Sequence, residues 1–147
     1  MATLVLINMA DLEAALDWSS AGDPFENQAF IDRLTGSLHF QSLHGDFGEE
    51  LPEDIEDGTH YIAMPHRNDL DLGRELVFEF ASSKAPQLEA QLHSVFRQKG
   101  AYGKFKAILE RAHLLEQWYE FEGAATKAAL LRWAEDNGFA VGRKSDA

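Results

Sequence analysis

The sequence predicts an α+β domain, and three observations predict it. Up to about Pro65, short runs of alternating apolar and polar residues are separated by turn formers, as in β-strands. Beyond Pro65, apolar residues recur every three or four positions, as in amphipathic helices. The 147 residues contain no internal repeat and no glycine-serine linker, so we expect a single domain over 1–147. Its small antiparallel sheet should be a hairpin plus a third strand, packed against four or five mostly C-terminal helices.

The amino-terminal residues predict a short strand followed by a helix. Residues 3–7 are rich in branched apolar side chains, which favour a strand. Asn8 is a typical N-cap residue, and we expect it to cap a helix over 9–18. The face of that helix directed to the core should comprise Leu12, Ala15 and Leu16.

A β-hairpin follows, with strands expected over 28–33 and 37–41. Gly36 lies in the turn between them and suits the positive φ that such a turn requires. Leu38 and Phe40 alternate with polar neighbours. One face of the second strand should therefore be buried and the other exposed.

An acidic segment separates the hairpin from the third strand. Seven of the twelve residues over 46–57 are acidic and none is basic, which predicts a solvated loop. The third strand is expected over 60–64, where Pro65 ends it. One face of this strand would carry His60, Ile62 and Met64, and the other Tyr61 and Ala63.

The helices should begin after the third strand. Asp69 can cap a helix that runs to about Ala81, and Pro86 can open a second helix that runs to Gln98. Gly100 interrupts the pattern before the next helix. The buried face of the first of these helices should comprise Leu72, Leu76 and Phe80.

The remaining apolar residues predict further helical turns. A helix that starts near Tyr102 should continue to Ala112, and further turns lead to a last helix that stops at 137–139. Gly138 suits the left-handed position that commonly ends a helix. The inner face of the last helix should comprise Ala124, Ala128, Leu131 and Ala134.

Composition and charge exclude several classes of protein. Because the chain has no cysteine, it excludes thiol nucleophiles, iron–sulfur clusters, disulfides and zinc fingers. The longest apolar run, over residues 4–7, is far too short to span a membrane, so we expect no membrane partner. No leader is visible at the amino end, so we expect a cytoplasmic location. A net charge of −12 argues against general coating of nucleic acid.

One segment of this acidic chain is basic. Residues 97–111 carry five basic side chains and one acidic one, for a local charge of +4, and the other 132 residues carry −16. With glycines and aromatic residues between the cations, the segment could bind a phosphate or a partner at a helix start. The alternative is that its lysines are solvated and pair with the acidic half of the chain. The candidate binding residues are Arg97, Lys99, Tyr102, Lys104 and Lys106.

The histidines suggest a metal site only if folding brings them together. Two candidates, His44 and Asp46, precede the third strand, and two others, His60 and His66, flank it. The chain has no H-E-x-x-H motif, and its serines lack a G-x-S-x-G motif. We therefore assign no metal ligand, no cofactor and no catalytic residue.

The order of four sequence patches resembles that of a known family. They are residues 31–36 (IDRLTG), 61–65 (YIAMP), 99–106 (KGAYGKFK) and 118–121 (WYEF) with Trp133 and Asn137-Gly138 behind the last. The chain is similar in this to the small acidic bacterial proteins of uncharacterised protein family one-five-eight. The resemblance covers about residues 28–139, implies a bacterial α+β domain and brings no catalytic residue. Gly103 stands where that family tends to have a second arginine, which thins the basic cluster.

These observations favour a non-enzymatic cytoplasmic module, binding or regulatory, that acts through protein contacts. Charge is strongly segregated along the chain, and no complete catalytic constellation is readable. Two alternatives stay open. The first is a small-anion or nucleic-acid-binding protein that uses residues 97–111, and the second is a metal-assisted hydrolase. The oligomeric state stays open as well.

Overall fold

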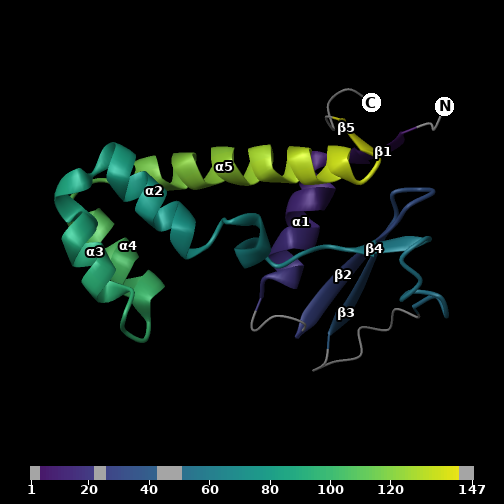
Figure 1. Ribbon diagram of the computed structural model, residues 1–147, viewed down its shortest axis with the longest axis horizontal. Helices are drawn as coiled ribbons and strands as arrows, with labels where there is room; N and C mark the ends of the chain where they lie inside the picture. Colours follow the sequence, from purple (N-terminus) through teal and green to yellow (C-terminus); the bar gives the residue numbers. More distant parts are fainter. Residues whose placement is uncertain (1–3, 22–25, 43–50, 143–147) are drawn as a thin grey trace. The chain divides into compact units, whose positions relative to one another are not determined.

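The computed structural model describes residues 4–21, 26–42 and 51–142 (Figure 1). Within them lie five α-helices, a three-stranded antiparallel sheet and a two-stranded parallel pair. The predicted α+β class is therefore confirmed.

The chain divides into two compact units. Unit 1 comprises residues 1–70 and 127–147, and unit 2 comprises residues 71–126. The acidity of the chain is concentrated in unit 1, which has seventeen acidic and six basic side chains and a net charge of −11. Unit 2 has eight acidic and seven basic side chains. The two units therefore differ strongly in net charge.

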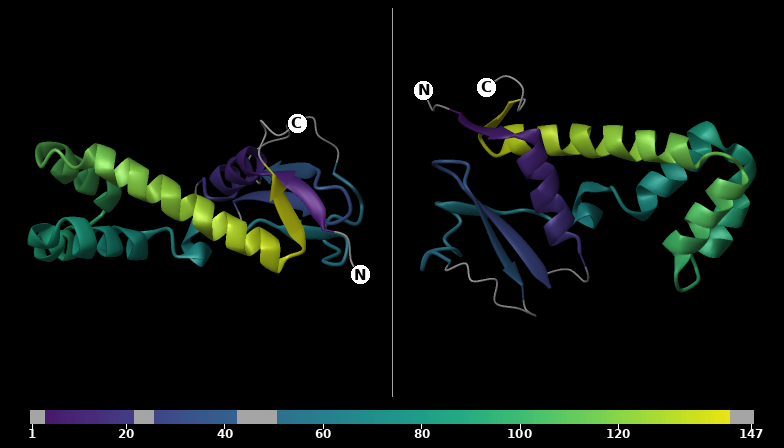
Figure 2. Two further views of the ribbon diagram at one scale, coloured as in Figure 1. Left: turned by 90° about the horizontal axis from the view of Figure 1, so that it is seen from above. Right: turned by 180° about the vertical axis from the view of Figure 1, so that it is seen from behind.

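In unit 1, the first and the last strand of the described residues pair with each other. β1 (Val5–Asn8) and β5 (Phe139–Gly142) run in parallel, with Val5 opposite Phe139 (Figure 2). β1 matches the strand predicted from residues 3–7. The sequence does not predict β5, because four residues directly after a helix carry too little periodicity to indicate a strand.

Helix α1 (Met9–Ser19) begins as predicted. The side-chain oxygen of Asn8 accepts a hydrogen bond of 2.8 Å from the backbone N–H of Asp11, which is the N-cap interaction. Leu12, Ala15 and Leu16 are fully buried, as their spacing predicts. The helix therefore presents one apolar face to the core of unit 1.

The antiparallel sheet has the order β3-β2-β4. Its strands are β2 (Asn27–Asp32), β3 (Leu38–Ser42) and β4 (Tyr61–Ala63). The predicted hairpin and third strand are therefore both confirmed. Trp18 ties α1 to this sheet, because its indole N–H lies 3.0 Å from the carbonyl oxygen of Gln28 and 3.1 Å from that of Gln41. The ring of Trp18 also meets that of Phe40 edge to face at 5.7 Å.

Gly36 in the hairpin turn has a φ of +78°, as the turn predicts. The turn also lies against β1: a Cβ on Gly36 would stand 2.9 Å from the carbonyl oxygen of Leu6. Glycine is required here twice over, once for its backbone angle and once for the close approach of the two chain segments.

The start of the first helix of unit 2 differs from the prediction. Asp69 lies in a short 3₁₀ helix, η1 (Arg67–Leu70), and its carboxylate accepts a bond of 3.3 Å from the N–H of His66. Asp71 has a φ of +58°, so the chain cannot continue as a helix through it, and α2 (Arg74–Lys84) begins only after Gly73. The prediction that Asp69 caps this helix is therefore wrong. Leu76 and Phe80 are buried in α2, as predicted, and Leu72 is buried as well but precedes the helix.

The remaining helices of the described residues have other bounds than predicted. The segment from Pro86 forms η2 (Pro86–Leu88) and the short α3 (Glu89–Val95) instead of one helix to Gln98. Gly100, with a φ of +68°, separates α3 from α4 (Ala101–Arg111), as predicted. The turns expected after α4 and the last helix form one continuous helix, α5 (Leu115–Asp136).

The core of unit 2 is aromatic. Trp118 is 1% exposed, and its ring meets those of Phe80 and Phe105 edge to face at 5.4 and 4.9 Å. Phe121, in the next turn of α5, contacts Phe80 at 5.3 Å. Tyr119, which lies between Trp118 and Phe121 in α5, is 48% exposed.

The inner face of the second half of α5 is rotated from the prediction. Thr126, Leu130 and Ala134 are buried at a spacing of four residues, whereas Leu131 is 41% exposed. Ala124 and Ala128 are exposed as well, so of the predicted face only Ala134 is buried. Alanines occur on both sides of this helix, and their spacing alone does not distinguish them. No helix among the described residues combines the length and the apolar character needed to cross a membrane.

Candidate functional site

The basic segment lies in the α3–α4 region of unit 2. Phe105 is fully buried, and Lys104 and Lys106 precede and follow it in α4. Because successive helical residues are rotated by about 100°, the two lysines leave the helix on opposite sides of Phe105. The Nζ of Lys104 donates a bond of 2.6 Å to Oε1 of Gln98. The Nζ of Lys106 lies 5.7 Å from the centre of the Tyr119 ring.

The other candidate residues of this segment lie at its surface. Tyr102 is 43% exposed, and its ring meets that of Phe96 edge to face at 5.2 Å. Arg97 and Lys99 are exposed in the turn before α4. The structure thus places Lys104 and Lys106 with separate partners on separate sides of α4.

The histidine candidates do not form a metal site within the part of the chain that the structure describes. His44 and Asp46 lie outside the described residues. Among those described, no group of three or more histidine, aspartate or glutamate side chains is placed to hold a metal ion. One ring nitrogen of His66, Nδ1, accepts a bond of 3.1 Å from the N–H of Asn68.

His60 instead bridges two carboxylates in unit 1. Its Nδ1 lies 2.6 Å from Oδ2 of Asp54, and its Nε2 lies 3.4 Å from Oδ2 of Asp32. A carboxylate oxygen only accepts hydrogen bonds, so the ring can satisfy both neighbours only when both of its nitrogens carry a proton. The hydrogen bond that the His60 ring donates to Asp54 accordingly raises the pKa of His60 above 6.5, together with the charges of Asp54 and Asp32. A ring protonated at both nitrogens has no lone pair for a metal.

The neighbouring acidic groups are arranged to stay charged. Burial by itself would raise the pKa of Asp32, but the backbone N–H of Leu34, at 2.7 Å, and the charge of His60 hold it below 3.8. The hydroxyl of Thr59 donates a bond of 2.7 Å to Asp57 and lowers its pKa as well. This local set is therefore an ion-pair network rather than a pair of acids poised for proton transfer.

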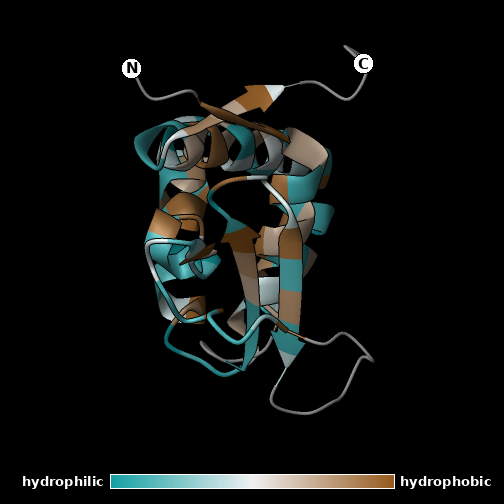
Figure 3. Ribbon diagram, turned by 90° about the vertical axis from the view of Figure 1, so that its right-hand side faces the viewer, coloured by the Kyte–Doolittle hydropathy of each residue, from teal (hydrophilic) through white to brown (hydrophobic). Residues whose placement is uncertain are grey.

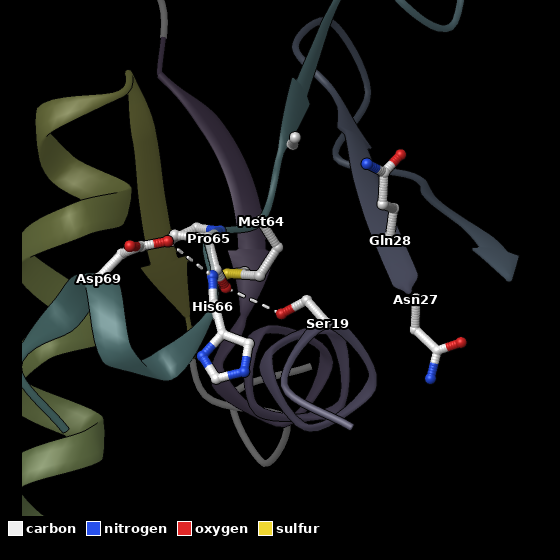
Figure 4. Close-up of a pocket in the computed structure, with 8 residues that line it drawn as sticks. Ser19, Asn27, Gln28, Met64, Pro65, His66 and Asp69 are labelled. Atoms are coloured by element: carbon white, nitrogen blue, oxygen red, sulfur yellow. Dashed lines mark hydrogen bonds between the residues drawn. The ribbon is translucent and has the colours of Figure 1, made fainter. Parts of the chain in front are cut away.

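A small cavity of about 140 Å³ lies in unit 1 beside β4 (Figure 4). The hydroxyl of Ser19 donates to the backbone carbonyls of Pro65, at 2.8 Å, and Leu16, at 3.1 Å, so no base activates it. Figure 4 shows the amide ends of Asn27 and Gln28 turned away from His66 and Asp69. The cavity is lined by Ser19, Asn27, Gln28, Ala63, Met64, Pro65, His66 and Asp69. Its polar groups do not converge on one point, as a catalytic site requires.

The pair β1–β5 has one buried and one exposed face. Ile7 and Phe139, on the inner face, are 3% and 1% exposed. On the outer face, Leu4 and Leu6 are 57% and 68% exposed. The side chain of Leu6 lies over Gly142, where a Cβ would stand 3.0 Å from its Cδ1. We call this surface, formed by Leu4, Leu6, Ala140 and Gly142, the outer face.

Figure 3 shows β1 and β5 drawn in the hydrophobic colours. The outer face is not predicted from the sequence, because residues 3–7 by themselves indicate only a strand. A signal was available: no residue from 1 to 10 carries a charged side chain, in a chain with 38 charged side chains in all. A strand that is apolar without interruption is typical of a strand buried on both faces.

Comparison with family models, with curated proteins and with solved structures found no match to this chain. The resemblance to uncharacterised protein family one-five-eight therefore stays a prediction.

Proposed function

We propose that the chain is a binding module that acts through protein contacts and docks its partner on the outer face. The observation that carries this proposal is the exposure of Leu4 and Leu6 on a parallel strand pair. Parallel sheets are almost always covered on both faces, because their strands are apolar on both sides. Exposed apolar surface of this kind is typical of sites that a partner covers.

The charge distribution supports the same surface. Residues 1–10 and 137–142 contain no charged side chain, so the strands that form the outer face can lose water without burying a charge. The remainder of unit 1 is strongly acidic. The occupant that we propose is accordingly an apolar face of a basic protein, because the charge of −11 would attract it and repel an acidic one.

Site-specific crosslinking tests this proposal. A photo-reactive residue at position 6 should capture a partner in the native cell extract, and the same residue at position 131 should not capture it. Leu131 is a suitable control because it is also an exposed leucine of unit 1 but lies on α5.

Binding of the purified partner then gives the decisive measurement. Leu6→Lys should weaken it by about tenfold or more, and Leu131→Lys by less than about twofold. Higher salt should slow association, since the acidic unit steers the partner. Equal capture at both positions, or binding unchanged by Leu6→Lys, would overturn the proposal.

The alternative of anion or nucleic-acid binding at 97–111 requires its cations to act together. The separate partners of Lys104 and Lys106 favour local roles for both. Titration with a single-stranded oligonucleotide at two salt concentrations distinguishes the two functions. Binding that weakens as salt rises, and that Lys99→Gln abolishes, would favour the alternative.

A further inference from the structure

Residues 51–59, which comprise the described part of the acidic segment and the two residues after it, are attached to the antiparallel sheet at one end. The Nε of Arg33 donates a bond of 2.7 Å to the carbonyl oxygen of Gly58, and the N–H of Arg33 donates one of 2.8 Å to that of His60. Within the segment, the N–H of Asp57 bonds to the carbonyl of Asp54 at 2.8 Å. These bonds hold the segment in turns beside the end of β2.

His60 adds side-chain ties on both sides of the same junction. Its ring stacks on that of Tyr61 at 4.0 Å, which fixes its plane. In that plane one nitrogen faces Asp54 of the acidic segment, and the other faces Asp32 at the end of β2. The ring therefore connects the segment to the hairpin through two carboxylates.

We propose that the Asp54–His60–Asp32 bridge is a proton-dependent latch, which holds the acidic segment 51–59 against the hairpin while His60 is charged and loosens it when His60 is neutral. A neutral imidazole carries one N–H, so it can donate to only one of the two carboxylates. The other carboxylate then faces a nitrogen lone pair, which repels it. Loss of a single proton from His60 therefore removes one of its two hydrogen bonds to the carboxylates.

The charged and titratable groups that face His60 determine the pH range over which the latch loosens. Asp54 and Asp57 belong to the segment, Asp32 to β2 and Tyr61 to β4, and the ring of His39 on β3 meets Tyr61 edge to face at 5.6 Å. The acidic neighbours favour the proton on His60, and burial only partly opposes them. The guanidinium of Arg33 is bound to the backbone at Gly58.

The direction of the pH dependence of stability follows from the effect of these groups on His60. Because the pKa of His60 is higher in the folded chain than its ordinary value of 6.5, the latch contributes stability in full below that value. The contribution is lost as the pH rises through the folded pKa. At acid pH the tie to Asp32 persists until that carboxyl protonates, at a pKa held below 3.8.

An NMR titration tests the latch. The ring protons of His60 should titrate with a midpoint above 6.5, and the backbone amides of Ile55, Asp57 and Leu34 should shift with the same midpoint. Hydrogen exchange of these amides, corrected for its intrinsic pH dependence, should accelerate across the same range.

Variants distinguish loosening of the latch from general unfolding of the chain. Asp54→Asn should lower the midpoint of His60 and keep the fold, because Asp54 is half exposed. His66→Gln serves as the matched control and should leave the titration of the three amides unchanged. A midpoint at or below 6.5, or amides that do not follow His60, would overturn the proposal. Both readouts are independent of the outer face, so failure of the proposed function would not affect them.

Discussion

Some positions in this chain require one particular residue because of the backbone conformation and the chain segment packed beside them. Gly36 is one, because it combines a φ of +78° with a backbone carbonyl of β1 at 2.9 Å from its missing Cβ. Gly36→Ala should lower the free energy of unfolding by about 2 to 3 kcal/mol, through strain in the turn and displacement of β1. Urea denaturation measures the change.

Gly58→Ala is the matched control for Gly36→Ala. Gly58 also lies in a turn of unit 1, but a Cβ there would meet nothing within 4 Å. Its substitution should change the free energy of unfolding by less than about 0.5 kcal/mol. Similar losses in the two variants would contradict the role that we assign to Gly36.

Asp71 and Glu75 form an unfavourable pair of carboxyls. The hydrogen bond and the charge of Asp71 raise the pKa of Glu75 above 4.5, and Asp71 itself has a φ of +58°. Asparagine tolerates this backbone angle and carries no charge. Asp71→Asn should therefore raise the free energy of unfolding at neutral pH.

The pH dependence of this gain has a definite sign. A carboxyl whose pKa is higher in the folded chain stabilises the fold below its unfolded pKa, and this contribution is lost as the pH rises. The advantage of Asp71→Asn should thus shrink as the pH falls below about 4.5. Thermal denaturation at several pH values measures it, with Glu79→Gln as a control for loss of one negative charge from α2. A gain that is constant with pH would contradict the pairing.

At the scale of elements, the two glycines around the start of α4 should have opposite effects. Gly103 lies inside the helix, where a Cβ would meet nothing within 4 Å. Gly103→Ala should raise the free energy of unfolding by about 0.5 to 1 kcal/mol through helix propensity.

Gly100→Ala is the counterpart, because a φ of +68° is strained for alanine. It should lower the free energy of unfolding by about 1 kcal/mol. If both alanines stabilise the chain, or both destabilise it, the boundary between α3 and α4 is not where the structure places it. Circular dichroism during denaturation measures both variants.

The sequence predicts elements with strong local signals and misses those that depend on distant partners. Asn8, Gly36 and Gly100 each act through their own backbone, so their positions at a cap, a turn and a helix boundary are predictable. β5 exists because β1 pairs with it, and its four residues carry no signal alone. The start of α2 is misplaced because the side chain of Asp69 bonds to His66, an alternative to capping that the sequence equally allows.

In the candidate sites, too, the sequence predicts what is local and misses what depends on distant partners. The sequence identifies every cation of the segment 97–111, but not that Lys104 and Lys106 have separate partners, because that depends on Gln98 and Tyr119 in three dimensions. It marks His60 as a candidate metal ligand, but not as a bridge between two carboxylates. The bridge to Asp54 and Asp32 needs the hairpin and the acidic segment to meet, which no spacing indicates.

At the scale of the whole molecule, the net charge of −12 should limit stability. Like charges repel one another within a compact fold, and salt screens the repulsion. Raising sodium chloride from about 0.02 to 0.2 M should increase the melting temperature by about 2 to 5 °C. Calorimetry measures the shift, and a melting temperature that falls as salt rises would mean that attractive ion pairs outweigh the repulsion.

The pairing of β1 with β5 also sets an order of events during synthesis. A ribosome makes β1 at the start of the described chain, and Phe139, the partner of Val5, follows only after unit 2 and most of unit 1 have been made. Until then the backbone groups of Val5 and Ile7 that pair with β5 have no strand to bond to, and Leu4 and Leu6 are exposed beside them. Contacts so distant in sequence form late and slowly. The nascent chain thus carries an unpaired apolar strand while the residues between β1 and β5 are made, and it is in this interval that a chaperone would be of most use.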